Sequence, residues 1–257
     1  MEIQKQSDFL MYLDNEEIQL FNIESIKKSL GYNGRKLNEI VENLVRIGFL
    51  HRLERGKYCR SIFNDENVIG TFLATDSSIA YWSALHLHGL TEQFPNTVFV
   101  QTTKKKNAVS VFGAYYQFVK IGSQKQVGIT YNSYGNYRYP ITDVEKTIVD
   151  CFDLPQYSGG YAELIRAFCQ AELNVEKLIN YCTSINNIAA IKRMGFLAEF
   201  FEKDYLVDFI YFAKTKINRT YNLFDPFGRP EGEPNPEWYL RLNLTKEDIR
   251  RINQNPY

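Results

Sequence analysis

The chain has 257 residues, of which 44% are hydrophobic and 15% aromatic, so it carries enough apolar surface for packed cores and is not a disordered protein. Its 30 Lys and Arg residues balance its 30 Asp and Glu residues, which excludes a basic field spread over the whole molecule. A chain of this length fits two domains.

The start of the sequence argues against export. Residues 1–10 carry acids and amides in place of a basic start and an apolar run, which is not the pattern of a signal peptide. No apolar stretch approaches the roughly 20 residues needed to span a bilayer. We therefore expect a cytoplasmic protein without membrane contact.

Three helices are predicted in the N-terminal part of the chain, at residues 7–13, 24–30 and 33–47, with a short strand at 18–21. Asn33 is suited to cap the third helix. Apolar residues at i, i+3, i+4 and i+7 of that helix predict one buried stripe, made of Leu37, Ile40, Val41 and Leu44.

Two strand-like segments follow, at residues 49–53 and 57–62, and Glu54-Arg55-Gly56 between them predicts a hairpin turn. The glycine supplies the positive φ that such a turn requires. Three helices followed by a hairpin predict a winged helix-turn-helix over residues 1–62.

Polar and basic side chains remain on the exposed side of the third helix and on the hairpin. Arg and Asn suit guanine and adenine edges in a major groove, and cations suit phosphates. Residues 24–60 hold nine Lys or Arg and four Glu, an excess of five positive charges. Our predicted contacts to duplex DNA are Asn33, Arg35, Lys36, Asn38, Arg52, Arg55, Lys57 and Arg60. Of these, Arg35 and Asn38 are expected to read bases. The alternative is a winged helix with a solvated charged face that contacts protein.

Residues 63–257 predict a second, mixed domain. Helices are expected at 65–75, 77–88 and 143–152, and strands at 97–102, 115–121, 127–131 and 137–141, forming a small, mainly antiparallel sheet within about 63–152. Further helices at 161–172, 175–182, 187–201 and 205–216, then an extended Pro-rich tail pinned by Trp238, fill the part from 153 to 257. The fold class is therefore α+β.

A polar cluster follows the first strand predicted for this domain. It consists of Thr102, Thr103, Lys104, Lys105 and Lys106. Hydroxyl and ammonium groups at a strand end are suited to hold phosphate. The alternative is a solvated loop that keeps a sheet edge soluble.

The acids Asp143, Glu145 and Asp150, near Lys146, raise the alternative of a metal-dependent nuclease targeted by the winged helix. The spacing argues against it, because all three acids share one predicted helix, with Asp143 as its N-cap and the others on different, solvated faces. Neither a Ser-His-Asp set nor a phosphate-binding glycine loop is present in the sequence. We expect no enzyme, no catalytic or metal-binding residues and no cofactor. A third alternative is a protein-interaction module that uses the sheet and the tyrosine-rich segment 131–139.

Several segments resemble the AbiEi family of antitoxins in order and spacing. They are Gly56-Lys57-Tyr58, residues 81–85, 88–93 and 98–104, the pattern Asp143-x-Glu145-Lys146-Thr147-x-x-Asp150, and residues 223–226 and 238–243. The resemblance covers nearly the whole chain.

This resemblance implies a component of a bacterial type IV toxin-antitoxin system. Its N-terminal winged helix would repress its own operon by binding inverted repeats in the operator. Its C-terminal domain would counteract a nucleotidyltransferase-like toxin without forming a stable complex with it.

Overall fold

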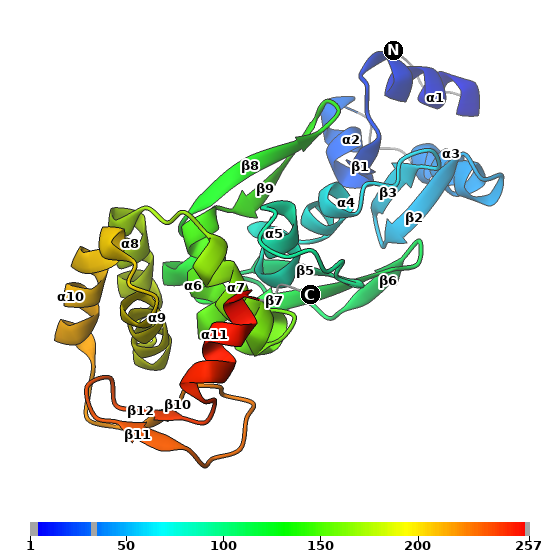
Figure 1. Ribbon diagram of the computed structural model, residues 1–257. Coiled ribbons are helices and arrows are strands. Elements are labelled where there is room, and N and C mark those ends of the chain that lie inside the picture. Colours follow the sequence, from blue (N-terminus) through cyan, green and yellow to red (C-terminus); the bar gives the residue numbers. More distant parts are fainter. Residues whose placement is uncertain (1–4, 32–34, 255–257) are drawn as a thin grey trace.

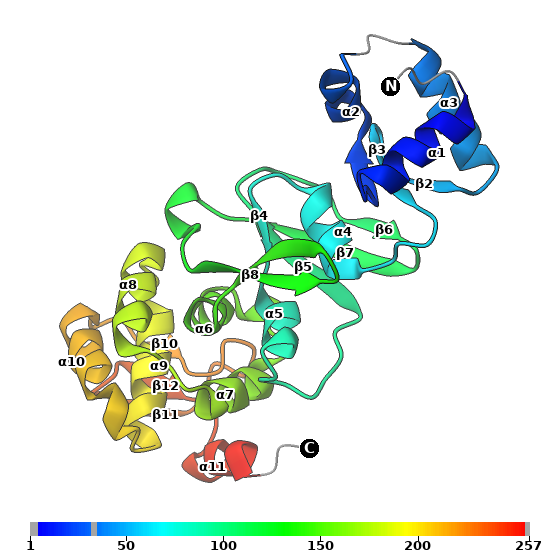
Figure 2. The same ribbon diagram turned by 90° about the horizontal axis from the view of Figure 1, so that it is seen from above.

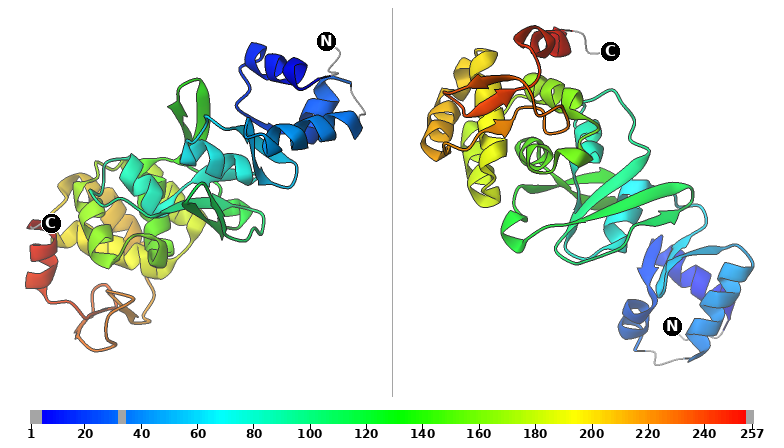
Figure 3. Two further views of the ribbon diagram at one scale, coloured as in Figure 1. Left: turned by 90° about the vertical axis from the view of Figure 1, so that its right-hand side faces the viewer. Right: turned by 90° about the horizontal axis from the view of Figure 1, so that it is seen from below.

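A computed structural model describes residues 5–31 and 35–254. The molecule is elongated, with the N-terminal unit at one end, a sheet-containing part in the middle and a helical part at the other end (Figures 1, 2 and 3). The chain has an α+β fold, as predicted. Among the described residues, no helix is both long and apolar enough to cross a membrane.

The N-terminal unit contains α1 (Gln6–Asn15), β1 (Leu20–Asn22), α2 (Ile23–Ser29), α3 (Arg35–Arg46), β2 (Leu50–Glu54) and β3 (Lys57–Arg60). The strands form an antiparallel sheet in the order β1-β3-β2. The predicted stripe of α3 is fully or almost fully buried and packs with Phe9 and Leu13 of α1 and with Ile26 of α2. Gly56 closes the β2–β3 turn with a φ of 78°. The proposed N-cap residue, Asn33, lies outside the described residues.

The three-stranded sheet is covered on both faces. Successive side chains of a strand point to opposite faces, and Leu50 and Tyr58 accordingly join the core under the helices. Leu53 and Cys59 join a different core, shared with the central sheet. The hairpin therefore belongs structurally to both parts of the molecule.

The central part contains α4 (Glu66–Leu73), β4 (Ser77–Ile79), α5 (Tyr81–Leu87), β5 (Thr97–Thr102), β6 (Val109–Val111), β7 (Ala114–Lys120), β8 (Ile129–Tyr134) and β9 (Tyr137–Thr142). They build a six-stranded sheet in the order β6-β7-β5-β4-β9-β8. Three of its pairings are antiparallel, while β4–β9 and β5–β7 are parallel. The sheet is larger and more mixed than predicted.

The predicted helix over residues 77–88 is wrong in its first part. Ser77, Ser78 and Ile79 form β4, which lies between β5 and β9 and is buried on both faces. The serine hydroxyls are satisfied there, because Ser77 Oγ donates to the carbonyl of Ala74 at 2.8 Å and Ser78 Oγ accepts from Gln101 at 2.9 Å. Only α5 is helical.

The helical part contains α6 (Val144–Asp153), α7 (Tyr161–Gln170), α8 (Val175–Ile185), α9 (Ile188–Phe200) and α10 (Val207–Lys216). These five helices agree with the predicted ones to within a few residues at each end. Short 3-10 turns stand at Ser123–Lys125, Pro155–Tyr157 and Asp204–Leu206. One large core joins the helices to α5 and to the end of the chain.

The end of the chain is not the extended tail that the prolines predicted. β10 (Asn222–Leu223), β11 (Glu233–Asn235) and β12 (Leu240–Leu242) form a small sheet, and α11 (Lys246–Gln254) follows. Trp238 is fully buried, as expected of an anchor. Its ring lies so close to Gly195 of α9 that a Cβ there would collide with it, and its Nε1 donates to Glu199 at 2.6 Å.

Candidate nucleic-acid interface

The exposed side of α3 carries the first group of candidate DNA contacts. Arg35, Lys36 and Asn38 are exposed, whereas Leu37 between them is fully buried. The hydrophobic stripe fixes the rotation of the helix on the core, so the polar residues of its first turns must face outward. The structure thus presents a cation-rich N-terminal half of α3 to solvent.

A hollow of about 490 Å³ separates α3 from the β2–β3 hairpin. Asn38 and Glu42 line it from α3, and Arg52, Arg55 and Tyr58 line it from the hairpin. Arg52 and Arg55 are exposed. One surface depression is therefore bordered by the candidate Asn38 of the helix and by the candidates Arg52 and Arg55 of the hairpin, which are distant from it in sequence.

Glu42 and Tyr58 connect the two walls of this hollow. The hydroxyl of Tyr58 donates to Glu42 Oε1 at 2.7 Å, and Arg52 Nη1 lies 3.9 Å from the same oxygen. Burial, together with the hydrogen bond to the Glu42 carboxylate, raises the pKa of Tyr58 to about 12. The local sequence did not predict this contact. The one sequence signal for it is that Tyr58 and Leu50 are apolar residues at strand positions that face α3.

Lys57 and Arg60, which the sequence assigned to phosphates, are engaged inside the molecule. Lys57 Nζ donates to the carbonyls of the last two residues of α4, at 3.0 and 2.7 Å, and lies 2.9 Å from Glu54 Oε1. Arg60 Nη1 lies 2.8 Å from Asp14 Oδ1, and its side chain is only 14% exposed. Because both side chains are mostly buried and held by internal partners, we do not propose Lys57 and Arg60 as DNA contacts.

The polar cluster after β5 divides into anchored and exposed residues. Thr102 is buried and its hydroxyl donates to the carbonyl of Thr75 at 2.8 Å. Thr103 and Lys106 are half-buried, and Lys106 Nζ contacts Glu54 Oε2 at 2.5 Å. Lys104 and Lys105 are exposed. The five residues therefore do not converge on one pocket.

Asp143 and Glu145 share the ammonium of Lys177, which lies 3.1 Å from Asp143 Oδ2 and 3.5 Å from Glu145 Oε2, whereas Asp150 has a different partner. Asp143 caps the helix by accepting from the backbone N–H of Lys146 at 2.9 Å, as predicted. Glu145 accepts from the backbone N–H of Asn174 at 2.8 Å, and Asp150 pairs with the ammonium of Lys146. The described residues include no group of three or more His, Cys, Asp or Glu side chains suited to hold a metal ion. This arrangement gives the nuclease alternative no support.

The prediction that Glu145 and Asp150 lie on solvated faces of α6 is wrong. Glu145, Lys146 and Asp150 are all buried, because α8 and α9 cover the helix. Burial raises the pKa of Asp150 above its ordinary value, although the Lys146 ammonium opposes this shift.

The tyrosine-rich segment forms the β8–β9 hairpin, which reaches the N-terminal unit (Figure 1). Tyr131 and Tyr134 are exposed. The hydroxyl of Tyr137 donates to the carbonyl of Glu17 and accepts from the backbone N–H of Gln19, each at 2.7 Å. Part of this segment therefore serves as an internal support.

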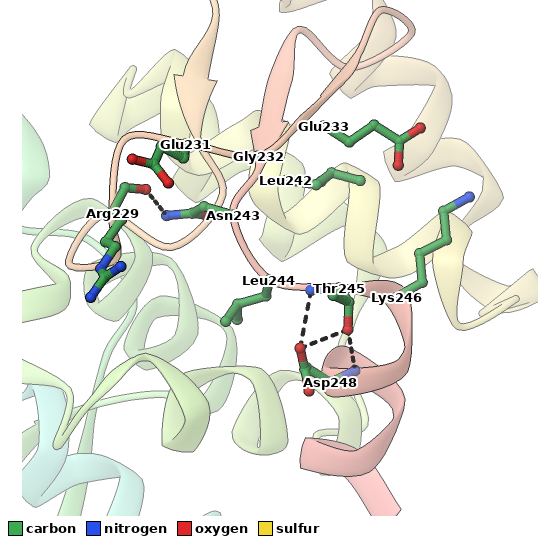
Figure 4. A pocket seen from close by; sticks show the side chains of 10 residues that line it. All are labelled: Arg229, Glu231, Gly232, Glu233, Leu242, Asn243, Leu244, Thr245, Lys246 and Asp248. Carbon is green, nitrogen blue, oxygen red and sulfur yellow. Dashed lines mark hydrogen bonds between the residues drawn. The ribbon is translucent and has the colours of Figure 1, made fainter.

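The C-terminal segment surrounds a further hollow of about 520 Å³ (Figure 4). Its charged side chains have both signs and are Arg229, Glu231, Glu233, Lys246 and Asp248. The Thr245 hydroxyl donates to Asp248 Oδ2 at 2.6 Å and accepts the Asp248 backbone N–H at 3.0 Å, so the first turn of α11 is already capped. We assign no ligand to this hollow.

The fold has a known structural counterpart. The crystal structure of the RV2827C protein from Mycobacterium tuberculosis is similar to this chain with a TM-score of 0.65 and 15% sequence identity, over 99% of this chain and 96% of that one. At this level of identity the likeness extends to the fold alone. No protein-family model and no curated protein matches the chain.

Proposed function

We propose that the N-terminal unit is a winged helix that binds duplex DNA, with α3 in the major groove and the β2–β3 hairpin as the wing. The observation that carries this proposal is the shared hollow, which has exposed Asn38 on its α3 wall and exposed Arg52 and Arg55 on its hairpin wall. Arg35 and Lys36 are also exposed on α3, and Lys36 lines a separate hollow between α3 and the start of α1. The proposal assigns base contacts to Arg35 and Asn38 and phosphate contacts to Lys36, Arg52 and Arg55.

Glu42 has a defined part in this proposal. Its carboxylate holds Tyr58 and lies 3.9 Å from Arg52 Nη1, so it limits the directions that Arg52 can take. A carboxylate near the groove is also suited to accept from the exocyclic amine of cytosine and to repel misplaced phosphates.

We further propose that the protein is an autorepressor and antitoxin of a type IV toxin-antitoxin system. This part rests on the resemblance to the AbiEi family, and the partners that it names are an operator with inverted repeats and a nucleotidyltransferase-like toxin. A repressor of this kind would act in the cytoplasm, where its operator is located.

Several residues that carry the resemblance lie at the junction of the sheet and the helices. Ser83 of α5 accepts from Phe99 N at 2.9 Å and donates to Thr97 O at 3.1 Å in β5. Thr147 of α6 lies 2.7 Å, Oγ1 to Oγ1, from Thr142 at the end of β9. These contacts maintain the fold, so the antitoxin activity needs its own test, which is growth of cells that express a nucleotidyltransferase-like toxin with and without this chain.

Fluorescence anisotropy with the DNA upstream of the gene tests the DNA-binding proposal. We expect Arg35→Ala to weaken binding to this DNA by about 1–3 kcal/mol if the guanidinium makes a bidentate base contact. The matched control is Arg219→Ala, since Arg219 is exposed and precedes β10 at the far end of the molecule. An equal loss on a scrambled duplex would contradict base reading by Arg35.

A further inference from the structure

The loop between β5 and β6 lies against the hairpin of the N-terminal unit. Lys106 in this loop contacts Glu54 Oε2 at 2.5 Å, and the other oxygen of Glu54 lies 2.9 Å from Lys57 Nζ. Further along, the ring of Phe112 meets that of His51 in β2, with centroids 4.8 Å apart. β6 accordingly lies beside β2 in Figure 1. Two basic segments that are separate in the sequence are thus neighbours in space.

The loop is held at both of its ends. At its start, the Thr102 hydroxyl donates to the carbonyl of Thr75 at 2.8 Å and accepts from the backbone N–H of Lys104 at 3.2 Å. Further along, the Lys106 ammonium binds Glu54 and lies 5.2 Å from the ring centroid of Phe118. The segment between these anchors is therefore presented in a defined position next to the hairpin turn.

Lys104 and Lys105 occupy this segment, and both are exposed. Within the part of the chain that the structure describes, no carboxylate or other partner is bound to either ammonium group. By contrast, Lys57 and Lys106 both pair with the carboxylate of Glu54. The neighbouring Thr103 hydroxyl donates to Asp76 Oδ2 at 3.4 Å. Two exposed cations without a carboxylate partner thus lie in the loop beside the hairpin.

We propose that Lys104 and Lys105 bind phosphates of the duplex beyond those contacted by the wing, so that the DNA footprint extends over the central part of the molecule. This inference rests on the proposed DNA binding. The Cα of Lys104 lies within about 7 Å of that of Lys106, because a residue spans at most about 3.6 Å. A duplex carries one charge per roughly 1.7 Å of its axis, so a duplex that continues past the hairpin brings further phosphates to this loop.

Duplex DNA is the partner that the geometry favours over an acidic protein or a membrane surface. The Lys106–Glu54 contact fixes the loop of the two lysines relative to the hairpin, whose turn carries the exposed Arg55. Their role is sequence-independent, since ammonium groups bind phosphates without reading bases.

The test is the salt dependence of binding to the upstream duplex and to a scrambled duplex. Each phosphate contact contributes about 0.9 to the slope of log K against log salt concentration. We therefore expect Lys104→Ala/Lys105→Ala to lower the slope by about 1.8 on both duplexes, because this variant lacks two phosphate-binding ammonium groups. The control is Lys216→Ala/Lys246→Ala, which removes the same charge from exposed sites in α10 and α11. Thermal unfolding of each variant shows whether the fold is intact.

The outcomes separate this inference from the function on which it rests. A wild-type chain without salt-dependent binding would contradict DNA binding itself. If the wild-type chain binds but the Lys104/Lys105 variant has an unchanged slope, the extended footprint alone is overturned. An equal decrease of the slope in the control variant would overturn it as well. A hydroxyl-radical footprint that is shorter at one end for the Lys104/Lys105 variant only would support it.

Discussion

At the scale of single residues, the ion pair between Lys146 and Asp150 is the most demanding feature of α6. Both side chains are almost completely buried, and Asp150 Oδ2 has no hydrogen-bond partner among the described residues. Gly128 lies so close that any Cβ there would come within 2.7 Å of the Lys146 Cβ. The pair is therefore enclosed, and each charge depends on the other.

We expect Lys146→Met to lower the free energy of unfolding by about 3–5 kcal/mol, because it leaves a buried carboxylate without its cation. The double variant Lys146→Met/Asp150→Leu should lose much less, since no unpaired charge remains. Urea denaturation of the two single variants and the double variant measures this coupling. Losses that simply add would show that the pair is not coupled.

The burial of the Lys146–Asp150 pair could not be predicted from the sequence. The spacing of Asp143 before α6 predicted the cap correctly, because capping is a local interaction within one turn. Charged residues within the helix predicted solvent exposure, but their surroundings come from α8 and α9, which follow in the chain. For the same reason, the exposure of Arg35 and Asn38 was predictable from the stripe of α3, whereas the internal contacts of Lys57 and Arg60 were not.

At the scale of elements, strand β4 shows where periodicity misleads. Ile79, Trp82 and Leu85 are spaced by three residues and predicted one continuous helix from Ser77. The backbone turns at Asp76, with a φ of 49°, between α4 and β4, and again at Tyr81, with a φ of 55°, where α5 begins. Three residues suffice for strand β4 because β5 and β9 pair with it on either side. The local sequence does not predict this pairing, since both partner strands come later in the chain.

Helix α4 depends on the β2–β3 hairpin for its C-terminal cap. Its last two carbonyls accept from Lys57 Nζ, whose side chain is only 16% exposed. We expect Lys57→Met to lower the free energy of unfolding by about 1–3 kcal/mol, the usual contribution of hydrogen bonds to a charged group. Urea denaturation measures the loss. The salt dependence of DNA binding should stay unchanged, and a slope lower by about 0.9 would instead restore Lys57 to the phosphate contacts.

At the scale of the whole molecule, the N-terminal unit and the central part share a joint that is too extensive for a flexible linker. Leu53, Cys59 and Phe63 are buried in the core of the central sheet. The Tyr137 hydroxyl binds the backbone beside β1, and Glu54 binds a lysine from each side. The predicted boundary at residue 62 falls between β3 and α4, but the core continues across it. If the N-terminal unit binds DNA as proposed, this joint would hold the central part in a fixed orientation to the duplex.

Glu54 makes this joint sensitive to acid. Burial alone would raise the pKa of its carboxyl group, but hydrogen bonds and attraction from Lys106 and Lys57 outweigh this effect and lower the pKa below the ordinary value of 4.5. The folded state thus binds fewer protons than the unfolded state near this value. The carboxylate therefore contributes stability that is complete above the unfolded pKa and is lost as the pH falls through the lowered pKa.

We expect wild-type protein to be more stable than Glu54→Gln at pH 7, because the amide carries no charge for the two lysines that Glu54 binds. The difference in the free energy of unfolding between wild type and variant should narrow as the pH falls below about 4.5, since protonation removes the same charge from the wild type. Urea denaturation at a series of pH values measures this difference. A difference that stays constant across the series would show that the Glu54 carboxylate does not stabilise the joint. If the joint positions the loop, Glu54→Gln should also reduce the share of the DNA-binding salt slope that depends on Lys104 and Lys105.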